Sequence, residues 1–190
     1  MDVDRFWALL AESATGARGR DAREAFLREH LLRADRADLL DFVAHLSATR
    51  EPANTYRLWH AADFFYEGYC SGDSFHYFQM WLVGLGRDAY DAAVADPDSL
   101  AAHPAVQRLA ALPQPWADDD YPEWETLEYV AVNVGNERPD VDGDVRDVLT
   151  EERGIHLRFD PHPVDVEWRQ PDMARAYPRM TALCGPLPHS

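Results

Sequence analysis

The chain has 190 residues, of which 46% are hydrophobic and 12% aromatic, and this is enough to bury one core of single-domain size. It carries 34 acidic and 18 basic side chains, a formal charge of -16 that repels phosphate backbones and anionic lipids, so we expect no nucleic-acid partner and no membrane partner. The chain contains no lysine, which excludes a Walker A phosphate site and Schiff-base chemistry.

The start of the chain and its two cysteines bear on where the protein works. No apolar run approaches the roughly 20 residues that span a bilayer, and the start MDVDRFW is acidic where a signal peptide is positively charged. Cys70 and Cys184 lie far apart and match no metal-ligand or redox spacing. We therefore expect a cytoplasmic protein with two free thiols.

Apolar residues at intervals of three and four positions predict helices through the first half of the chain. Pro52 and Asn54 interrupt this pattern, which resumes at Thr55 and ends at Gly68. The helices expected in this half span residues 3–14, 20–33, 36–49, 55–68 and 75–85.

Proline governs the second half, because twelve of the thirteen prolines lie at or after Pro97 and break the chain into shorter pieces. The segment at 154–168, GIHLRFDPHPVDVEW, alternates weakly and is compatible with one or two short strands. The helices expected here span residues 86–95, 104–111, 122–134, 144–153 and 172–183. The pattern predicts a mainly α fold, a single-domain helical bundle over residues 1–190 with a proline-rich, loop-rich C-terminal part.

The connection after the fourth expected helix is rich in reactive side chains. On a helical wheel, His60, Asp63 and Glu67 share the face opposite to the apolar residues, so we expect a solvated polar stripe. Ser71 and Asp73 are both placed to cap the next helix, and we expect Asp73 to do so. Two helices joined by a short connection pack antiparallel, so this segment is predicted to be a helix corner.

Two chemical alternatives use the same corner. The residue types that could ligate a metal at helical spacing are His60, Asp63, Glu67 and His76. Antiparallel packing turns His60 and His76 away from the shared seam, so we do not expect them to converge. The GDSF sequence at 72–75 is similar to the nucleophile block of the GDSL hydrolases, but a helix precedes it where that family has a strand, and no aspartate beyond the block precedes a histidine by three residues.

Four segments together resemble one family. They are FW at 6–7, LWHAA at 58–62, CSGDSFHYFQMWLVGLGR at 70–87 and DPDSLA at 96–101. On these residues the chain resembles the bacterial domain of unknown function 4240 from Phe6 to about Tyr129. The resemblance implies a mostly helical region over 6–129 and a bacterial source, brings no established activity, and leaves an irregular extension over 135–190.

The family pattern also implies roles for single residues. In the family the corner is a serine followed by two acidic residues, and Gly72 replaces the first of these, which argues against a paired carboxylate. Arg87 is expected to join segments through Asp73 or Asp96, with binding of an anionic ligand as the alternative. Of the other carried-over residues, the aromatic ones are expected in the core, Ser71 and Asp73 at a helix cap, and Gly86 at the end of a helix. The residues carried over are Trp59, Ser71, Asp73, Phe75, Phe78, Trp81, Gly86 and Arg87.

The segment PQPWADDDYPEW at 113–124 is the expected partner-binding surface. Its prolines predict a loop, and it places aromatic side chains on either side of three consecutive carboxylates. A tryptophan can anchor a partner, and exposed carboxylates speed encounter with a basic one. The alternative is that the tryptophan packs back on the core. The candidate residues are Trp116, Asp118, Asp119, Asp120 and Tyr121.

Two classes of function remain open. The favoured class is a non-catalytic acidic helical protein that binds another protein, in particular a basic one, as a regulator or an immunity-like inhibitor. The other class is a small enzyme, with or without a metal, that uses polar groups around the corner at 59–87. We expect no cofactor, and the oligomeric state stays open. The candidate ligand-binding or structural residues of the corner are Trp59, His60, Ser71, Asp73 and Arg87.

Overall fold

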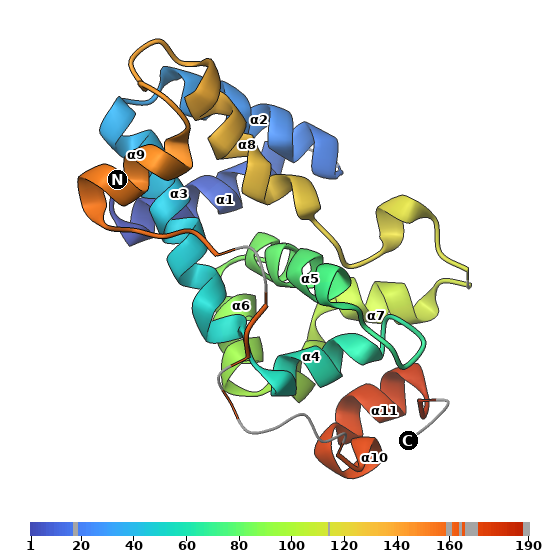
Figure 1. The fold of residues 1–190 in the computed structure, drawn as a ribbon. Coiled ribbons are helices and arrows are strands. Elements are labelled where there is room, and N and C mark those ends of the chain that lie inside the picture. Colours follow the sequence, from blue (N-terminus) through green and yellow to red (C-terminus); the bar gives the residue numbers. More distant parts are fainter. Residues whose placement is uncertain (17–18, 114, 159–160, 164, 166–170, 188–190) are drawn as a thin grey trace. The chain divides into compact units, whose positions relative to one another are not determined.

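A computed structural model gives the fold, and it describes residues 1–16, 19–113, 115–158, 161–163, 165 and 171–187. These residues form α-helices and short 3-10 turns, which confirms the prediction of a mainly α fold (Figure 1). The strands expected over 154–168 are not found in the described residues of that segment, and its other residues lie outside the described part. Among the described residues, no helix combines the length and the apolar character that a bilayer span needs.

The chain groups into two compact units, each made of two separate stretches. Unit 1 comprises Met1–Glu51 and Trp124–Phe159. Unit 2 comprises Pro52–Glu123 and Asp160–Ser190. The single-domain organisation over residues 1–190 stays a prediction.

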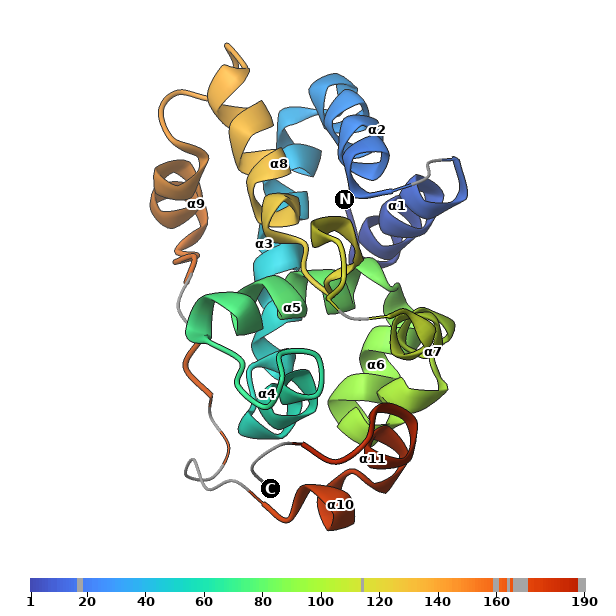
Figure 2. The ribbon, with the colours of Figure 1, turned by 90° about the vertical axis from the view of Figure 1, so that its right-hand side faces the viewer.

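Unit 1 is a group of helices in which α8 packs against α2 and α3, and α9 packs against α3 and α8 (Figures 1 and 2). Its core is centred on the fully buried ring of Phe6, which lies 5.3 Å from the Trp7 ring and 5.2 Å from the Phe42 ring. The helices of unit 1 are α1 (Val3–Gly16), α2 (Arg20–Arg33), α3 (Arg36–Arg50), α8 (Glu125–Glu137) and α9 (Val145–Arg153).

The contact between α8 and α9 depends on a glycine. Gly135 is buried in α8, and a Cβ atom there would lie 1.9 Å from Cγ2 of Val145, the first residue of α9. No side chain larger than hydrogen fits at this position while the two helices keep their distance. Gly135 therefore sets how closely these helices approach.

Unit 2 is arranged around a 3-10 segment, η2, which contacts α4, α6, α7 and α11. Its core is aromatic, because the rings of Phe65, Phe78 and Trp81 lie 5.5 to 6.2 Å from one another. The elements of unit 2 are α4 (Tyr56–Asp63), α5 (Gly72–Gly84), α6 (Arg87–Ala95), η2 (Pro97–Ala102), α7 (Pro104–Ala111), η3 (Asp118–Asp120), α10 (Met173–Ala176) and α11 (Pro178–Cys184). A further 3-10 turn, η1 (Glu51–Ala53), joins the first stretch of unit 1 to unit 2.

Two expected helices in unit 2 have different bounds in the structure. The helix expected to reach Gly68 ends at Asp63. It cannot extend to Gly68, because Glu67 and Gly68 adopt positive φ values of 53° and 90° in the turn that follows. The helix expected over 172–183 is divided at Tyr177, whose φ of -130° is not helical. The division follows from Pro178, since the residue before a proline disfavours the α conformation.

Candidate functional site

The corner between α4 and α5 is stabilised by a serine cap. The Ser71 hydroxyl oxygen accepts a hydrogen bond of 3.1 Å from the backbone N–H of Ser74, so Ser71 is the N-cap of α5. The prediction that Asp73 caps this helix is wrong, because the helix begins at Gly72 and Asp73 lies inside its first turn. A carboxylate in the first turn still interacts favourably with the positive end of the helix dipole.

The polar stripe predicted on α4 is only partly solvated. His60 and Asp63 are buried, with exposed fractions of 4% and 2%, while Glu67 is exposed. The prediction is wrong for the first two because their polar atoms meet other polar groups inside the unit: Nδ1 of His60 lies 3.3 Å from Oδ2 of Asp63. Oδ1 of Asp63 accepts a hydrogen bond of 2.9 Å from the backbone N–H of Cys70, which ties the connecting segment to the end of α4.

These buried groups do not form a nucleophilic centre around Cys70. Burial raises the pKa of the Cys70 thiol, and the negative charges of Asp63 and Glu123 raise it further. A thiol with a raised pKa is a poor nucleophile at neutral pH, since the thiolate is the reactive form. Within the described part of the chain, no group of three or more His, Cys, Asp and Glu side chains could hold a metal ion.

Arg87 begins α6, and its guanidinium Nε lies 3.8 Å from Oδ2 of Asp91, one turn further along the same helix. The link that was expected between Arg87 and Asp73 or Asp96 stays a prediction, and a link of this kind is made by another arginine. Arg179 forms ion pairs with both Asp96 and Asp98, and so joins α11 to η2.

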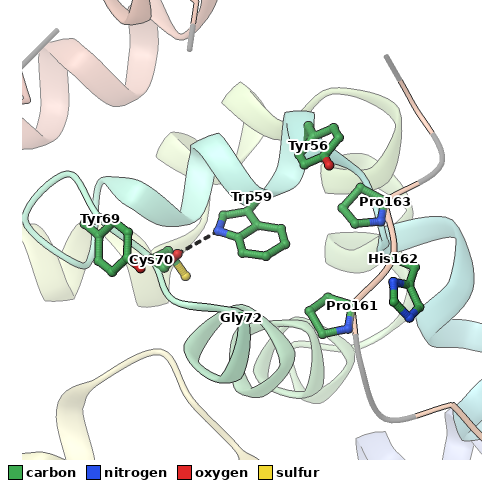
Figure 3. Close-up of a pocket in the computed structure, with 8 residues that line it drawn as sticks. All are labelled: Tyr56, Trp59, Tyr69, Cys70, Gly72, Pro161, His162 and Pro163. Carbon is green, nitrogen blue, oxygen red and sulfur yellow. Dashed lines mark hydrogen bonds between the residues drawn. The ribbon is translucent and has the colours of Figure 1, made fainter. Parts of the chain in front are cut away.

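A pocket of about 520 Å³ opens beside the corner, within unit 2 (Figure 3). It is lined by aromatic and proline side chains together with backbone of the α4–α5 connection, and we call it the corner pocket. Figure 3 shows Trp59 between Tyr69 on one side and the segment Pro161–Pro163 on the other. The described residues that line the corner pocket are Tyr56, Trp59, Tyr69, Cys70, Gly72, Pro161, His162 and Pro163.

Trp59 is held rigidly at the centre of the corner pocket. Its ring stacks on the ring of Phe75 from α5, with centroids 4.5 Å apart and an angle of 15° between the planes. Its indole Nε1–H donates a hydrogen bond of 2.8 Å to the carbonyl oxygen of Cys70. The Tyr56 ring, one turn earlier in α4, stacks on the Trp59 ring with centroids 6.3 Å apart. Tyr69, in contrast, is 77% exposed. The pocket therefore combines the packed rings of Tyr56 and Trp59 with the exposed ring of Tyr69.

The wall formed by residues 161–163 comes from a distant part of the sequence. It is positioned by Asp165, whose carboxylate accepts hydrogen bonds of 2.6 Å and 3.2 Å from the backbone N–H groups of Tyr56 and Arg57 at the start of α4. The sequence-based prediction missed this wall, and it also missed Tyr56 and Tyr69. The Pro-x-Pro spacing at 161–163 was the available signal, because such segments are extended and dock on aromatic side chains.

The expected partner-binding segment forms a loop that contains the 3-10 turn η3. Trp116 is half-buried, and its ring meets the Tyr121 ring edge-on at 5.5 Å. Tyr121 in turn stacks on Tyr66 at 6.3 Å. Trp116 is thus packed back on unit 2, while Asp119 is exposed and Asp120 half-buried. None of the described residues of this segment lines the corner pocket.

Fold and site together define a mainly α protein whose corner residues are held by structural hydrogen bonds beside an open aromatic pocket. The chain belongs to the family described as protein of unknown function DUF4240, whose model matches residues 1–135. The match contains the whole corner and confirms the family expected from the sequence, whereas Pro161–Pro163 lie beyond it. No curated protein and no solved structure matches the chain.

Proposed function

We propose that this protein works without catalysis, by binding another protein that carries a basic surface, and that unit 2 provides the binding surface. The observation that carries the proposal is the charge of unit 2. Its first stretch, residues 52–123, contains eleven acidic residues, of which Asp63 and Asp98 are buried, and three arginines, a formal charge of -8 in 72 residues. A surface of this kind accelerates encounter with a basic partner and disfavours acidic ones.

The engagement of the corner residues supports a binding role over a catalytic one. Ser71 uses its hydroxyl as a helix cap, and Asp63 uses its carboxylate on the Cys70 backbone. Hydrogen bonds of this kind stabilise a fold, and they occupy the oxygen atoms that a general base or nucleophile would need. The corner is thus better suited to present a rigid surface than to move protons.

The test begins with a partner purified to homogeneity after capture from the source cells on the full chain. Its association with the full chain is measured at 50 and 300 mM NaCl by a surface-based kinetic method. The variant replaces Asp118, Asp119 and Asp120 by asparagine. We expect a slower association rate for the variant and a smaller effect of salt, with an unchanged melting temperature.

A matched control removes the same number of charges from unit 1. Asp142, Asp147 and Glu151 are exposed, and they are replaced by asparagine, asparagine and glutamine. We expect the control to associate at nearly the wild-type rate. The proposal fails if the partner is not basic, or if the association rate is indifferent to salt and equal for the wild type and both variants.

A further inference from the structure

The corner pocket presents three electron-rich rings to one space. Tyr56, Trp59 and Tyr69 belong to a single short stretch of unit 2, and all three line the pocket. The face of an aromatic ring attracts a cation that comes within about 6 Å of its centroid, most strongly for tryptophan. The indole N–H of Trp59 already donates to the carbonyl oxygen of Cys70, and one face of its ring stacks on Phe75, so a ligand would meet this ring through its π-system and not through a hydrogen bond.

The charges around the corner pocket are suited to the same kind of ligand. None of the eight described lining residues is an arginine. Asp73 follows Gly72 directly and is exposed, and Glu67 is exposed two positions before Tyr69. The nearest arginine in sequence is Arg57, which is exposed beside Tyr56. In sequence, two acidic residues and one arginine thus adjoin the lining, which itself contains one histidine, His162.

The wall at Cys70 lies beside a carboxylate, because the Cys70 backbone N–H donates a hydrogen bond of 2.9 Å to Oδ1 of Asp63. The charges of Asp63 and Glu123 add to the effect of burial in raising the pKa of the Cys70 thiol. Any group whose anionic form is disfavoured by its neighbours lies in a negative potential. A cation placed against this wall is stabilised by the potential that disfavours the thiolate.

We propose that the corner pocket binds the cationic side chain of an arginine or lysine that a partner protein presents. The inference rests on the proposed function, since it names the side chain of the basic partner that reaches furthest into unit 2. A volume of about 520 Å³ is within the range of roughly 300 to 1,000 Å³ found for ligand pockets. A long, flexible basic side chain can enter such a pocket while its backbone stays at the rim.

The test uses two short peptides that differ only in charge. The probes are acetyl-Gly-Arg-Gly-amide and acetyl-Gly-citrulline-Gly-amide, because citrulline has the shape of arginine without its charge. Binding to the full chain is followed by the NMR signal of the Trp59 indole N–H, which is identified by its absence in Trp59→Phe. We expect the arginine peptide to shift this signal and to bind about 2- to 30-fold more tightly than the citrulline peptide.

Variants at Tyr69 and Asp73 test whether the Tyr69 ring and the Asp73 charge contribute to binding of the arginine peptide. Tyr69→Leu removes an aromatic ring from a position that is 77% exposed, so the fold is expected to persist, and circular dichroism checks this. We expect Tyr69→Leu to weaken the arginine peptide several-fold, and Tyr69→Phe, which keeps the ring, to bind as the wild type does. Asp73→Asn should weaken it at low salt, whereas Asp88→Asn on α6 should not.

Two results would overturn the inference. The first is equal binding of the arginine and citrulline peptides, which would make the corner pocket a neutral site. The second is an unshifted Trp59 signal. If either occurs while the purified partner still associates in a salt-dependent way, the proposed function stands and its surface lies elsewhere on unit 2. If the arginine peptide binds as expected but no basic partner is found, the pocket assignment holds and the proposed function fails.

Discussion

Oδ1 of Asp98 in η2 accepts a hydrogen bond of 2.8 Å from the backbone N–H of Met180 in α11. Oδ2 of the same carboxylate accepts from the backbone N–H of Arg179 at 3.1 Å and from its Nε at 2.9 Å. The first N–H groups of a helix have no partner within the helix. Asp98 therefore supplies, from a distant part of unit 2, the cap that the residue before α11 does not provide.

Removal of this cap should destabilise the protein. Asp98 is only 4% exposed, so in Asp98→Ala the N–H of Met180 is left buried without its acceptor. We expect a loss of about 1–3 kcal/mol in the free energy of unfolding, measured by urea denaturation. The exposed Asp142→Ala serves as the control and should change little. Equal stability of both variants would show that α11 does not depend on this carboxylate.

The same contact should make stability depend on pH. Burial alone would raise the pKa of Asp98, but hydrogen bonds from the Arg179 side chain and from the backbone of Met180 and Arg179 lower it overall. A folded-state pKa below the unfolded value stabilises the fold above the unfolded pKa of about 3.9, and this contribution is lost as the pH falls toward the folded value. We expect the melting temperature to fall less steeply below pH 4 in Asp98→Asn than in the wild type. Parallel curves would contradict this.

The approach of α8 to α9 predicts an unusual effect of alanine. In a helix interior, glycine to alanine is normally favourable by about 0.5–1 kcal/mol. At Gly135 the added Cβ meets Val145, so we expect Gly135→Ala to be destabilising, by about 1–3 kcal/mol for an overpacked core. Gly72→Ala is the control, since its Cβ would lie 3.8 Å from Cγ of Pro161, an ordinary contact. Thermal unfolding of both variants decides the matter, and a Gly135→Ala protein as stable as the wild type would refute it.

The two corner residues should differ in their effect on stability. Ser71→Ala removes the cap of α5 and should cost about 0.5–2 kcal/mol. Asp73→Ala removes only a charge from the first turn, an effect of about 0.3–1 kcal/mol that high salt diminishes. Urea denaturation at low and high salt distinguishes the two, because the cap does not depend on salt. A larger loss for Asp73→Ala would return the capping role to that residue.

The two cysteines should react at different rates with a thiol reagent at pH 8. The pKa of the Cys70 thiol is raised by burial and by neighbouring negative charges, and that of Cys184 is raised by partial loss of hydration alone. Cys70 is also buried, whereas Cys184 is exposed near the end of α11. We expect Cys184 to be labelled first, and Cys70 to be labelled only as the protein opens. Mass spectrometry of Cys70→Ser and Cys184→Ser identifies each site, and faster labelling at Cys70 would overturn the assignment.

Helices were predictable from the sequence wherever a long apolar face repeats. The expected bounds of 20–33 and 86–95 agree with α2 and α6 to within one residue at each end, because their apolar spacing and flanking glycines act locally. The division at Tyr177 could also have been predicted, because Pro178 disfavours the α conformation of the residue before it.

The site was less accessible to prediction because its parts come together through tertiary contacts. A helical wheel assigns Asp63 to the solvent side, but it cannot foresee that the chain returns and offers the Cys70 N–H to its carboxylate. Arg179 was likewise not singled out, because its ion pair with Asp96 joins residues that are 83 positions apart in the sequence. Hydrophobic periodicity predicts local secondary structure, and it does not predict contacts between residues far apart in the sequence.

The division of unit 1 into two stretches has a consequence for synthesis in the cell. The helices of Met1–Glu51 leave the ribosome before the residues of Trp124–Phe159 exist, with the first stretch of unit 2 made in between. At about 5–20 residues per second, the nascent chain waits roughly 5 to 20 s for α8 and α9. Over this interval the leucine faces of α2 and α3 lack the helix that covers them, which exposes apolar surface of the kind that chaperones recognise, and slow codons between the two stretches would prolong that exposure.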